Sequence, residues 1–165
     1  MLELSGRLPV NLRRSAEGAA LRAIAHADPL AAIRLLERLP PNAERGASLA
    51  EVATRYAELD AEAAIGWAQS LSPASRSVRS AVAAAVADMD LERAVELALE
   101  WDVQPSASVP IGTRVAIDPT RARTVADALA ARGDARARTL LDAVVGSWWN
   151  IDAEGAFDWI AAHPA

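Results

Sequence analysis

Apolar and polar residues alternate with the period of an α-helix in five segments of this chain, and each segment begins with an aspartate. Counted from that aspartate, apolar residues recur at positions +4, +7 and +8, and in four segments also at +11, which places them on one helix face. Position +4 is alanine in all five. Aspartate is a preferred N-cap, so the pattern predicts five amphipathic helices that start after Asp28, Asp60, Asp90, Asp118 and Asp152.

A second helix is predicted between each aspartate and the next. Counted backwards from the following aspartate, apolar residues occupy positions −1, −4 and −8 in three of the four intervals. This spacing predicts a buried stripe on each of these helices. The residues at position −1 are Leu59, Met89, Ile117 and Ile151.

Start and stop signals separate the two helices of each unit. Asn42 and Ser72 are candidate N-caps of the second helices in the first two units. In the fourth unit, Gly133 suits the end of the first helix and Asp134 suits the N-cap of the second. Each unit is therefore expected to be a pair of antiparallel helices.

The five aspartates are spaced regularly along the chain, with intervals of 32, 30, 28 and 34 residues and a mean of 31. A period in this range is typical of helical-repeat proteins. We therefore expect an all-α protein with a single α-helical repeat domain over residues 1–165. The expected architecture is an α-solenoid of antiparallel helix pairs, with units starting near residues 28, 60, 90, 118 and 152.

The third unit departs from this pattern. Its second-helix region contains Pro105, Pro110 and Gly112, which predict an irregular segment over residues 102–109 and a short helix from Pro110 to Ile117. Loops on regular scaffolds often carry function. A degenerate repeat that only bends the solenoid explains the same residues, and the role of the 102–112 segment stays open.

Both ends of the sequence resemble the interior of a repeat. Residues 15–27 match a second helix, and the residues before them resemble the end of a first helix. The sequence stops where a connection to a further helix would begin. We therefore expect partial repeats at both ends, in a segment of a longer array or in a chain whose end helices pack on something else. Self-association through the open solenoid ends is one such contact.

The junction sequences YAELDAEAAIGWA (Tyr56–Ala68) and AIDPTRA (Ala116–Ala122) resemble those of the tetratricopeptide superfamily and its Sel1-like relatives. The resemblance extends from Ser15 to Ala165, although the W-x2-L-G-x2-Y pattern is missing. The DP-x-x-A…W repeats of many bacterial proteins are a closer match. The resemblance implies a right-handed superhelix that binds peptide or protein partners, often as a scaffold.

Composition narrows the function classes. Alanine supplies 40 of the 165 residues, which favours helices, and all 17 basic residues are arginine. The net charge of −5 argues against a nucleic-acid partner. No stretch reaches the roughly 18 apolar residues that a membrane span requires, so direct membrane insertion is not expected. Cysteine is absent, and the compartment stays open between cytoplasm and periplasm, with the cytoplasm slightly preferred.

Residues that could carry catalysis are sparse. His26 and Asp28 are two positions apart, but Asp28 is explained as a cap and no third metal ligand is near in sequence. Glu96 and Glu100 are neighbours on one polar helix face, where solvent exposure explains them. The sequence contains no glycine-rich phosphate loop. We therefore expect no catalytic residues, no metal and no cofactor.

The interpretation that fits best is a scaffold whose first helices line a groove for a peptide or protein. An α-helical enzyme or ligand-sensing domain is the alternative, with a pocket near the third unit lined by Trp101 and Arg123. The candidate partner-binding residues are Arg34, Arg38, Gln69, Glu96, Glu100, Arg121, Arg123, Asp127, Trp149 and Asp158.

Two of these candidates have more than one interpretation. Arg123 occupies position +5, where the other units have apolar residues, so its stem could cover the core or its guanidinium could pair with an acid. Trp149 follows Trp148, which belongs to the buried stripe, and points about 100° away from it. Trp149 is therefore either an exposed binding anchor or packed against the next helix.

Overall fold

The computed structural model describes residues 10–38, 43–72 and 75–163, and for residues 10–18 and 43–44 only the helical backbone. These ranges contain ten helices and no strands, which confirms the all-α class. The first helices, which follow the five aspartates, are α2 (Pro29–Glu37), α4 (Ala61–Ser70), α6 (Leu91–Trp101), α8 (Pro119–Arg132) and α10 (Ala153–Ala162). The second helices are α1 (Val10–Ala27), α3 (Ala43–Leu59), α5 (Arg76–Val86), α7 (Pro105–Ala116) and α9 (Ala135–Ile151).

Each of the five aspartates caps a first helix, as the sequence predicts. At the α3–α4 junction Asp60 is the only residue between the two helices, and its backbone is extended, with φ −152°. Its N–H donates to the Tyr56 carbonyl at 2.9 Å, which completes α3. Its carboxylate accepts from Ala63 N–H at 3.0 Å, and its carbonyl accepts from Ala64 N–H at 3.0 Å, which starts α4.

The other four aspartates bond in a closely similar way. Their side chains accept from backbone N–H groups of the first helical turn. Each backbone carbonyl accepts from the N–H of the alanine at +4, at distances of 2.8–3.2 Å. These alanines have no exposed surface, which confirms their predicted burial. They are Ala32, Ala64, Ala94, Ala122 and Ala156.

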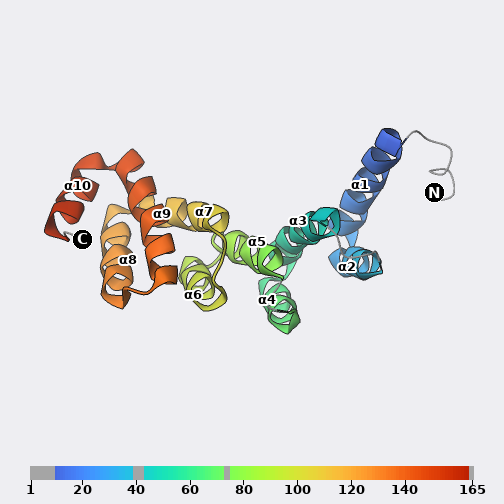
Figure 1. The fold of residues 1–165 in the computed structure, drawn as a ribbon, viewed down its shortest axis with the longest axis horizontal. Helices are drawn as coiled ribbons and strands as arrows, with labels where there is room; N and C mark the ends of the chain where they lie inside the picture. The colour runs from blue at the N-terminus through green and yellow to red at the C-terminus, as the bar shows by residue number, and fades with distance from the viewer. Residues whose placement is uncertain (1–9, 39–42, 73–74, 164–165) are drawn as a thin grey trace.

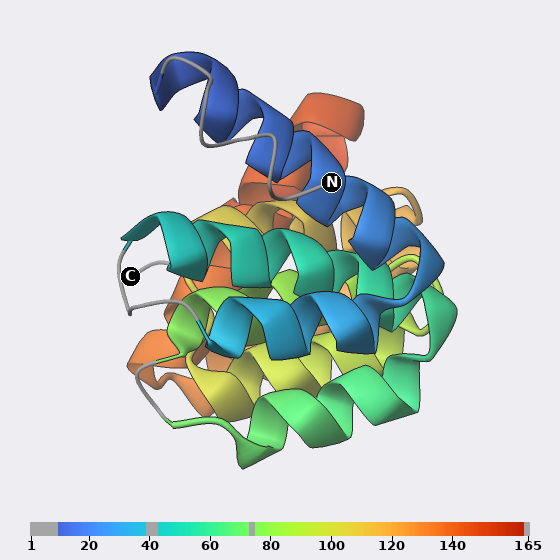
Figure 2. The same cartoon turned by 90° about the vertical axis from the view of Figure 1, so that its right-hand side faces the viewer.

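The second helices pack against one another in sequence, from α1 on α3 to α7 on α9. Each first helix packs on second helices, and no two first helices in the described part of the chain share an extensive contact. The helices follow one another across the molecule from α1 to α10 (Figure 1). Seen from the side, the turns between α1 and α2 and between α3 and α4 lie at the same end of the helix layers (Figure 2).

The predicted irregular segment over residues 102–109 is wrong. Only residues 102–104 separate the helices, and α7 starts with Pro105 in its first turn, where a missing N–H costs nothing. Pro110 lies inside α7 and does not end it. The residue four positions earlier, Ser106, is exposed like Pro110, so the lost hydrogen bond falls on the solvent side.

The predicted stripe of the second helices is correct at −4 and −8 but wrong at −1. Val82, Val144 and Trp148, for example, are almost completely buried. At −1 the side chains are more than half exposed, because each second helix ends one to four residues before the aspartate and no helix extends past the junction to cover them. The exposed fractions are 56% for Leu59, 52% for Met89, 60% for Ile117 and 52% for Ile151.

The predicted turn residues have mixed outcomes. Gly133 ends α8 in the left-handed conformation, with φ 67°, and Asp134 caps α9, as predicted. Hydrogen bonds from the Ala137 N–H and from Arg132 lower the pKa of Asp134. Ser72 does not cap α5, which starts at Arg76 after Ser75. Asn42 lies outside the described residues.

We expect Ala64→Leu and Ala94→Leu each to lower the free energy of unfolding by about 1–3 kcal/mol, because neither site has space for three more carbons. Thermal or urea unfolding measures the change. Ala128→Leu, at an exposed position of α8, is the matched control and should unfold like the wild type. Wild-type stability of both buried variants would show that the repeat register is wrong.

A second prediction concerns the contact between α7 and α9. A Cβ atom on Gly112 would lie 2.6 Å from the Ala143 backbone, so Gly112→Ala must push the two helices apart and should cost about 1–3 kcal/mol. Gly146→Ala, in α9 with open space around it, should instead stabilise by about 0.5–1 kcal/mol. The two urea unfolding curves should move in opposite directions, and a parallel shift would contradict the close approach.

Candidate interaction surface

All ten predicted partner-binding residues are exposed, and they are distributed over five first helices and α9. Where these ten residues contact other side chains, their partners are mainly residues outside this set. Arg34 lies 3.9 Å from Asp28, and Glu96 accepts from Arg93 at 2.9 Å. The hydrogen bond to Glu96 raises the pKa of Arg93. Because the first helices share no extensive contact with one another, these residues do not form one compact cluster.

Two of the ten have evident structural roles. Asp127 accepts a hydrogen bond from the indole N–H of Trp159 at 2.7 Å, and the His163 ring stacks on Trp159 with centroids 4.3 Å apart. The Arg123 guanidinium lies over the Trp148 ring, 5.9 Å from its centroid, in a cation–π contact. Arg123 therefore joins α8 to α9 through an aromatic ring.

The two adjacent tryptophans differ in burial, as their spacing along the helix predicts. Trp148 is 1% exposed, and its indole N–H donates to the Asp152 carboxylate at 3.3 Å. Trp149 is 47% exposed. Of its two interpretations, the structure therefore favours the exposed one.

Two arginines that the sequence analysis did not single out close the ends of first helices. Arg79 of α5 donates to the carbonyls of Ala68 and Leu71, at the end of α4. Arg136 of α9 donates to the carbonyls of Leu99 and Glu100, at the end of α6. Charged side chains at helix C-termini satisfy carbonyls that lack an intrahelical partner. Arg79 contacts the helix directly before its own, whereas Arg136 reaches a helix 36–37 residues earlier in the chain, which spacing alone could not reveal.

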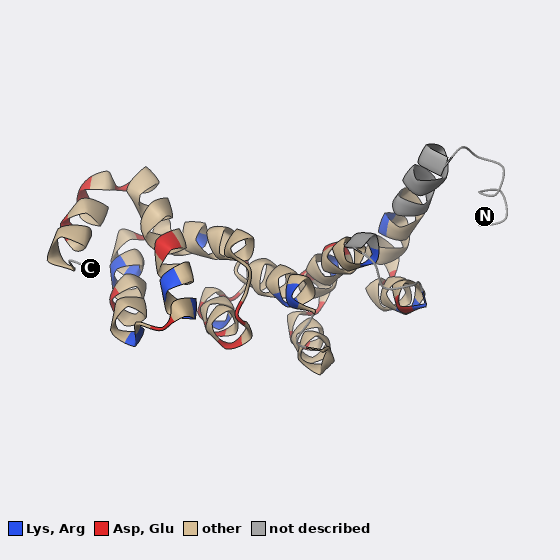
Figure 3. Cartoon of the chain, in the orientation of Figure 1, with Lys and Arg blue, Asp and Glu red and all other residues tan. Residues whose placement is uncertain are grey.

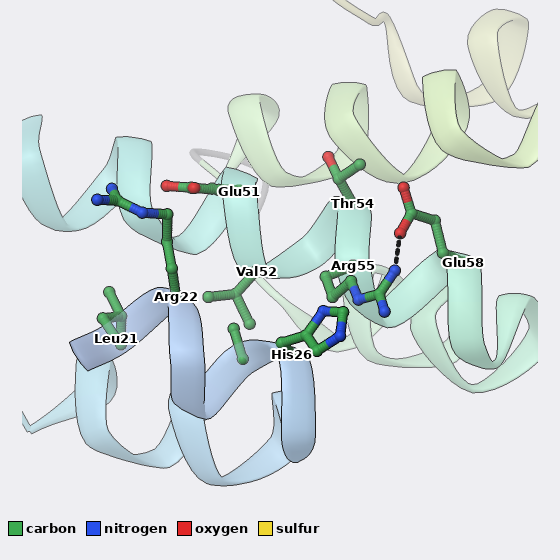
Figure 4. Close-up of a pocket in the computed structure, with 9 residues that line it drawn as sticks. Leu21, Arg22, His26, Glu51, Val52, Thr54, Arg55 and Glu58 are labelled. Carbon is green, nitrogen blue, oxygen red and sulfur yellow. Dashed lines mark hydrogen bonds and ion pairs between the residues drawn. The ribbon is translucent and has the colours of Figure 1, made fainter. Parts of the chain in front are cut away.

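A pocket of about 300 Å³ lies between α1 and α3 (Figure 4). Its apolar lining comes from Leu21, Ala25 and Val52. Arginine, histidine and glutamate side chains from both helices surround these residues, and Arg55 donates to Glu58 at 2.6 Å. Positive and negative groups are mixed, so the pocket has no strong preference for one charge.

The most regular exposed feature is the row formed by Leu59, Met89, Ile117 and Ile151, here called the junction row. Each of the four residues stands directly before a capping aspartate in the sequence. An open depression of about 480 Å³, here called the junction hollow, lies between the α5–α6 and α7–α8 junctions. Met89, Leu91 and Ile117 supply its apolar lining.

Charged residues complete the lining of the junction hollow. Four acids and two arginines line it, and Arg114 pairs with Asp88 across it. The sequence analysis missed this site, because it assigned the −1 residues to the core. The signal was present as the repeated order of a large apolar residue followed by aspartate.

The described residues contain no group of three or more histidines, aspartates or glutamates that could hold a metal ion. Within the same residues, no helix combines the length and apolar character needed to cross a bilayer. No family model, curated protein or solved structure matches the chain.

The structural role of Asp127 is testable. Asp127→Ala removes the acceptor of the Trp159 indole and should lower the free energy of unfolding by about 1 kcal/mol. Asp158→Ala, at an exposed position of α10, is the matched control and should leave stability within about 0.5 kcal/mol of wild type. Urea unfolding followed by tryptophan fluorescence measures both, and equal stability of the two variants would contradict the role.

Proposed function

We propose that this chain forms a right-handed α-solenoid with repeats of about 31 residues, and that it acts as a scaffold binding a peptide or protein partner. The alternation of first and second helices supports the repeat, as do the five aspartate caps and the buried alanines. The resemblance of the junction sequences to tetratricopeptide and Sel1-like repeats points to the same class.

The junction row is the observation that carries the proposed function. Single exposed apolar residues are normal on protein surfaces, but a repeated row of them on neighbouring elements is typical of an interaction site. An apolar residue before an N-cap often packs on the fourth residue of the helix. Here that fourth residue is a small, buried alanine, and the row side chains remain more than half exposed.

The shape of the surface favours a macromolecular partner. The junction hollow is open and lies between two junctions, so a segment that follows the row can place side chains into it. Large apolar side chains such as leucine, methionine and isoleucine stabilise a complex when a partner removes them from water, by about 25 cal/mol per Å² of apolar area.

The experiment compares capture of proteins by three forms of the immobilised chain. The row variant carries Leu59→Ser, Met89→Ser and Ile117→Ser. The control variant carries Val109→Ser, Phe157→Ser and Ile160→Ser, which are exposed apolar positions outside the row. A specific partner should be captured by wild type and control, and roughly tenfold less by the row variant, because a few buried anchors carry most binding energy.

Circular dichroism should first show equal melting temperatures for the wild type and the row variant, since all three replaced side chains are exposed. Equal capture by the row variant and the wild type would contradict the proposed surface. Loss of capture by the control variant alone would place the partner on α7 and α10 instead.

A further inference from the structure

The acidic charge of this protein is concentrated at the junction row. The five-residue segments centred on the four junction aspartates are 58–62, 88–92, 116–120 and 150–154. They contain three, three, one and two acids, and no basic residue. The whole chain has a net charge of −5, so these 20 residues carry −9 and the other 145 carry +4. Acidic residues are visible at the turn between α9 and α10 (Figure 3).

Helix capping accounts for part of this charge. The aspartates accept hydrogen bonds from their own helices, and acids in a first helical turn interact favourably with the helix dipole. Capping does not require the exposed apolar residue beside each aspartate. It also does not explain the hollow between two junctions. The surface therefore combines apolar contact area with negative charge.

Three glutamates extend this charge beyond the caps. Glu62, Glu92 and Glu154 each lie two residues after a junction aspartate and are exposed. Glu58 pairs with Arg55 and Asp88 pairs with Arg114, while the charge of Glu62 helps to raise the pKa of Arg93. Along the sequence, each of the three glutamates follows a residue of the junction row by three positions.

The spacing of the row suits a helical partner. Packed helices lie about 8–10 Å apart, so successive junctions should repeat at roughly that distance. Residues seven apart on an α-helix are separated by about 10.5 Å along its axis. An amphipathic helix with large apolar residues at heptad spacing can therefore place one side chain at each junction.

We propose that the junction row and the junction hollow bind a basic amphipathic helix of a partner protein. Its apolar face covers Met89 and Ile117, and its arginine or lysine side chains face Glu62, Glu92 and Glu154. This inference rests on the proposed scaffold function and adds the chemical class of the partner. The negative charge at this edge disfavours binding of an anionic membrane surface or a nucleic acid.

The test uses two labelled 21-residue peptides with leucine at positions a and d of three heptads. The remaining positions are mainly lysine in one peptide and mainly glutamate in the other. Fluorescence anisotropy should show that the wild-type chain binds the lysine peptide at least tenfold more tightly than the glutamate peptide. Raising the salt from 50 to 500 mM should weaken that binding, because the paired charges are exposed.

Two variants with the same change in net charge localise the site. Glu62→Gln, Glu92→Gln and Glu154→Gln together should weaken binding of the lysine peptide about tenfold. Glu37→Gln, Glu51→Gln and Asp142→Asn, at exposed positions away from the junctions, should change it less than twofold. The Leu59→Ser, Met89→Ser, Ile117→Ser variant should also lose binding.

Three results would overturn the inference. They are equal weakening by the two charge variants, equal binding of the two peptides, and no binding of the lysine peptide by the wild type. None of these three results decides the outcome of the capture experiment with the row variant. If that capture still depends on the junction row, the scaffold function stands and only the basic character of the partner is rejected.

Discussion

The fold depends on the hydrogen bonds of the junction aspartates, which at Asp28, Asp60, Asp90 and Asp152 run in two directions. At Asp60 the N–H completes the helix before it, while the carbonyl and the carboxylate start the helix after it. One residue therefore satisfies groups at the end of one helix and the start of the next, which helix termini otherwise leave without partners. The chain reverses without a loop, so the two helices begin and end at fixed positions.

The same junction explains both the buried alanines and the exposed row. The residue at +4 lies one turn into the first helix, where that helix crosses its neighbours, and alanine is the side chain that fits there. The residue at −1 lies on the other side of the reversal, and no element continues past it. Ala64 is completely buried, whereas Leu59, five residues earlier, is 56% exposed. A tight reversal thus leaves a large apolar side chain in water at the four junctions from α3–α4 to α9–α10.

The sequence predicted the helical class, the five caps and the buried alanines, because these features depend on residues close together in the chain. It placed the start of α7 five residues too late, at Pro110, since Pro105 was interpreted as a break although it is compatible with a helix start. Pro110 lies on an exposed face inside the helix. The sequence missed the junction row, because periodicity assumes that a helix continues beyond its last turn. The roles of Asp127, Arg123 and Arg136 depend on contacts between helices, and no spacing rule predicts them.

At each junction, some positions are required by the fold and others can vary to suit a partner. The aspartate and the alanine are required by the fold, so neither can change to suit a partner. The side chains at positions −1 and +2 are exposed, and the fold does not require a particular residue there. At the α7–α8 junction, position +2 is Thr120 instead of glutamate. Arg114 and Arg121 line the junction hollow beside it. This junction is the least acidic of the four in the junction row. A partner helix in the proposed site would therefore carry its basic residues mainly opposite the α3–α4, α5–α6 and α9–α10 junctions.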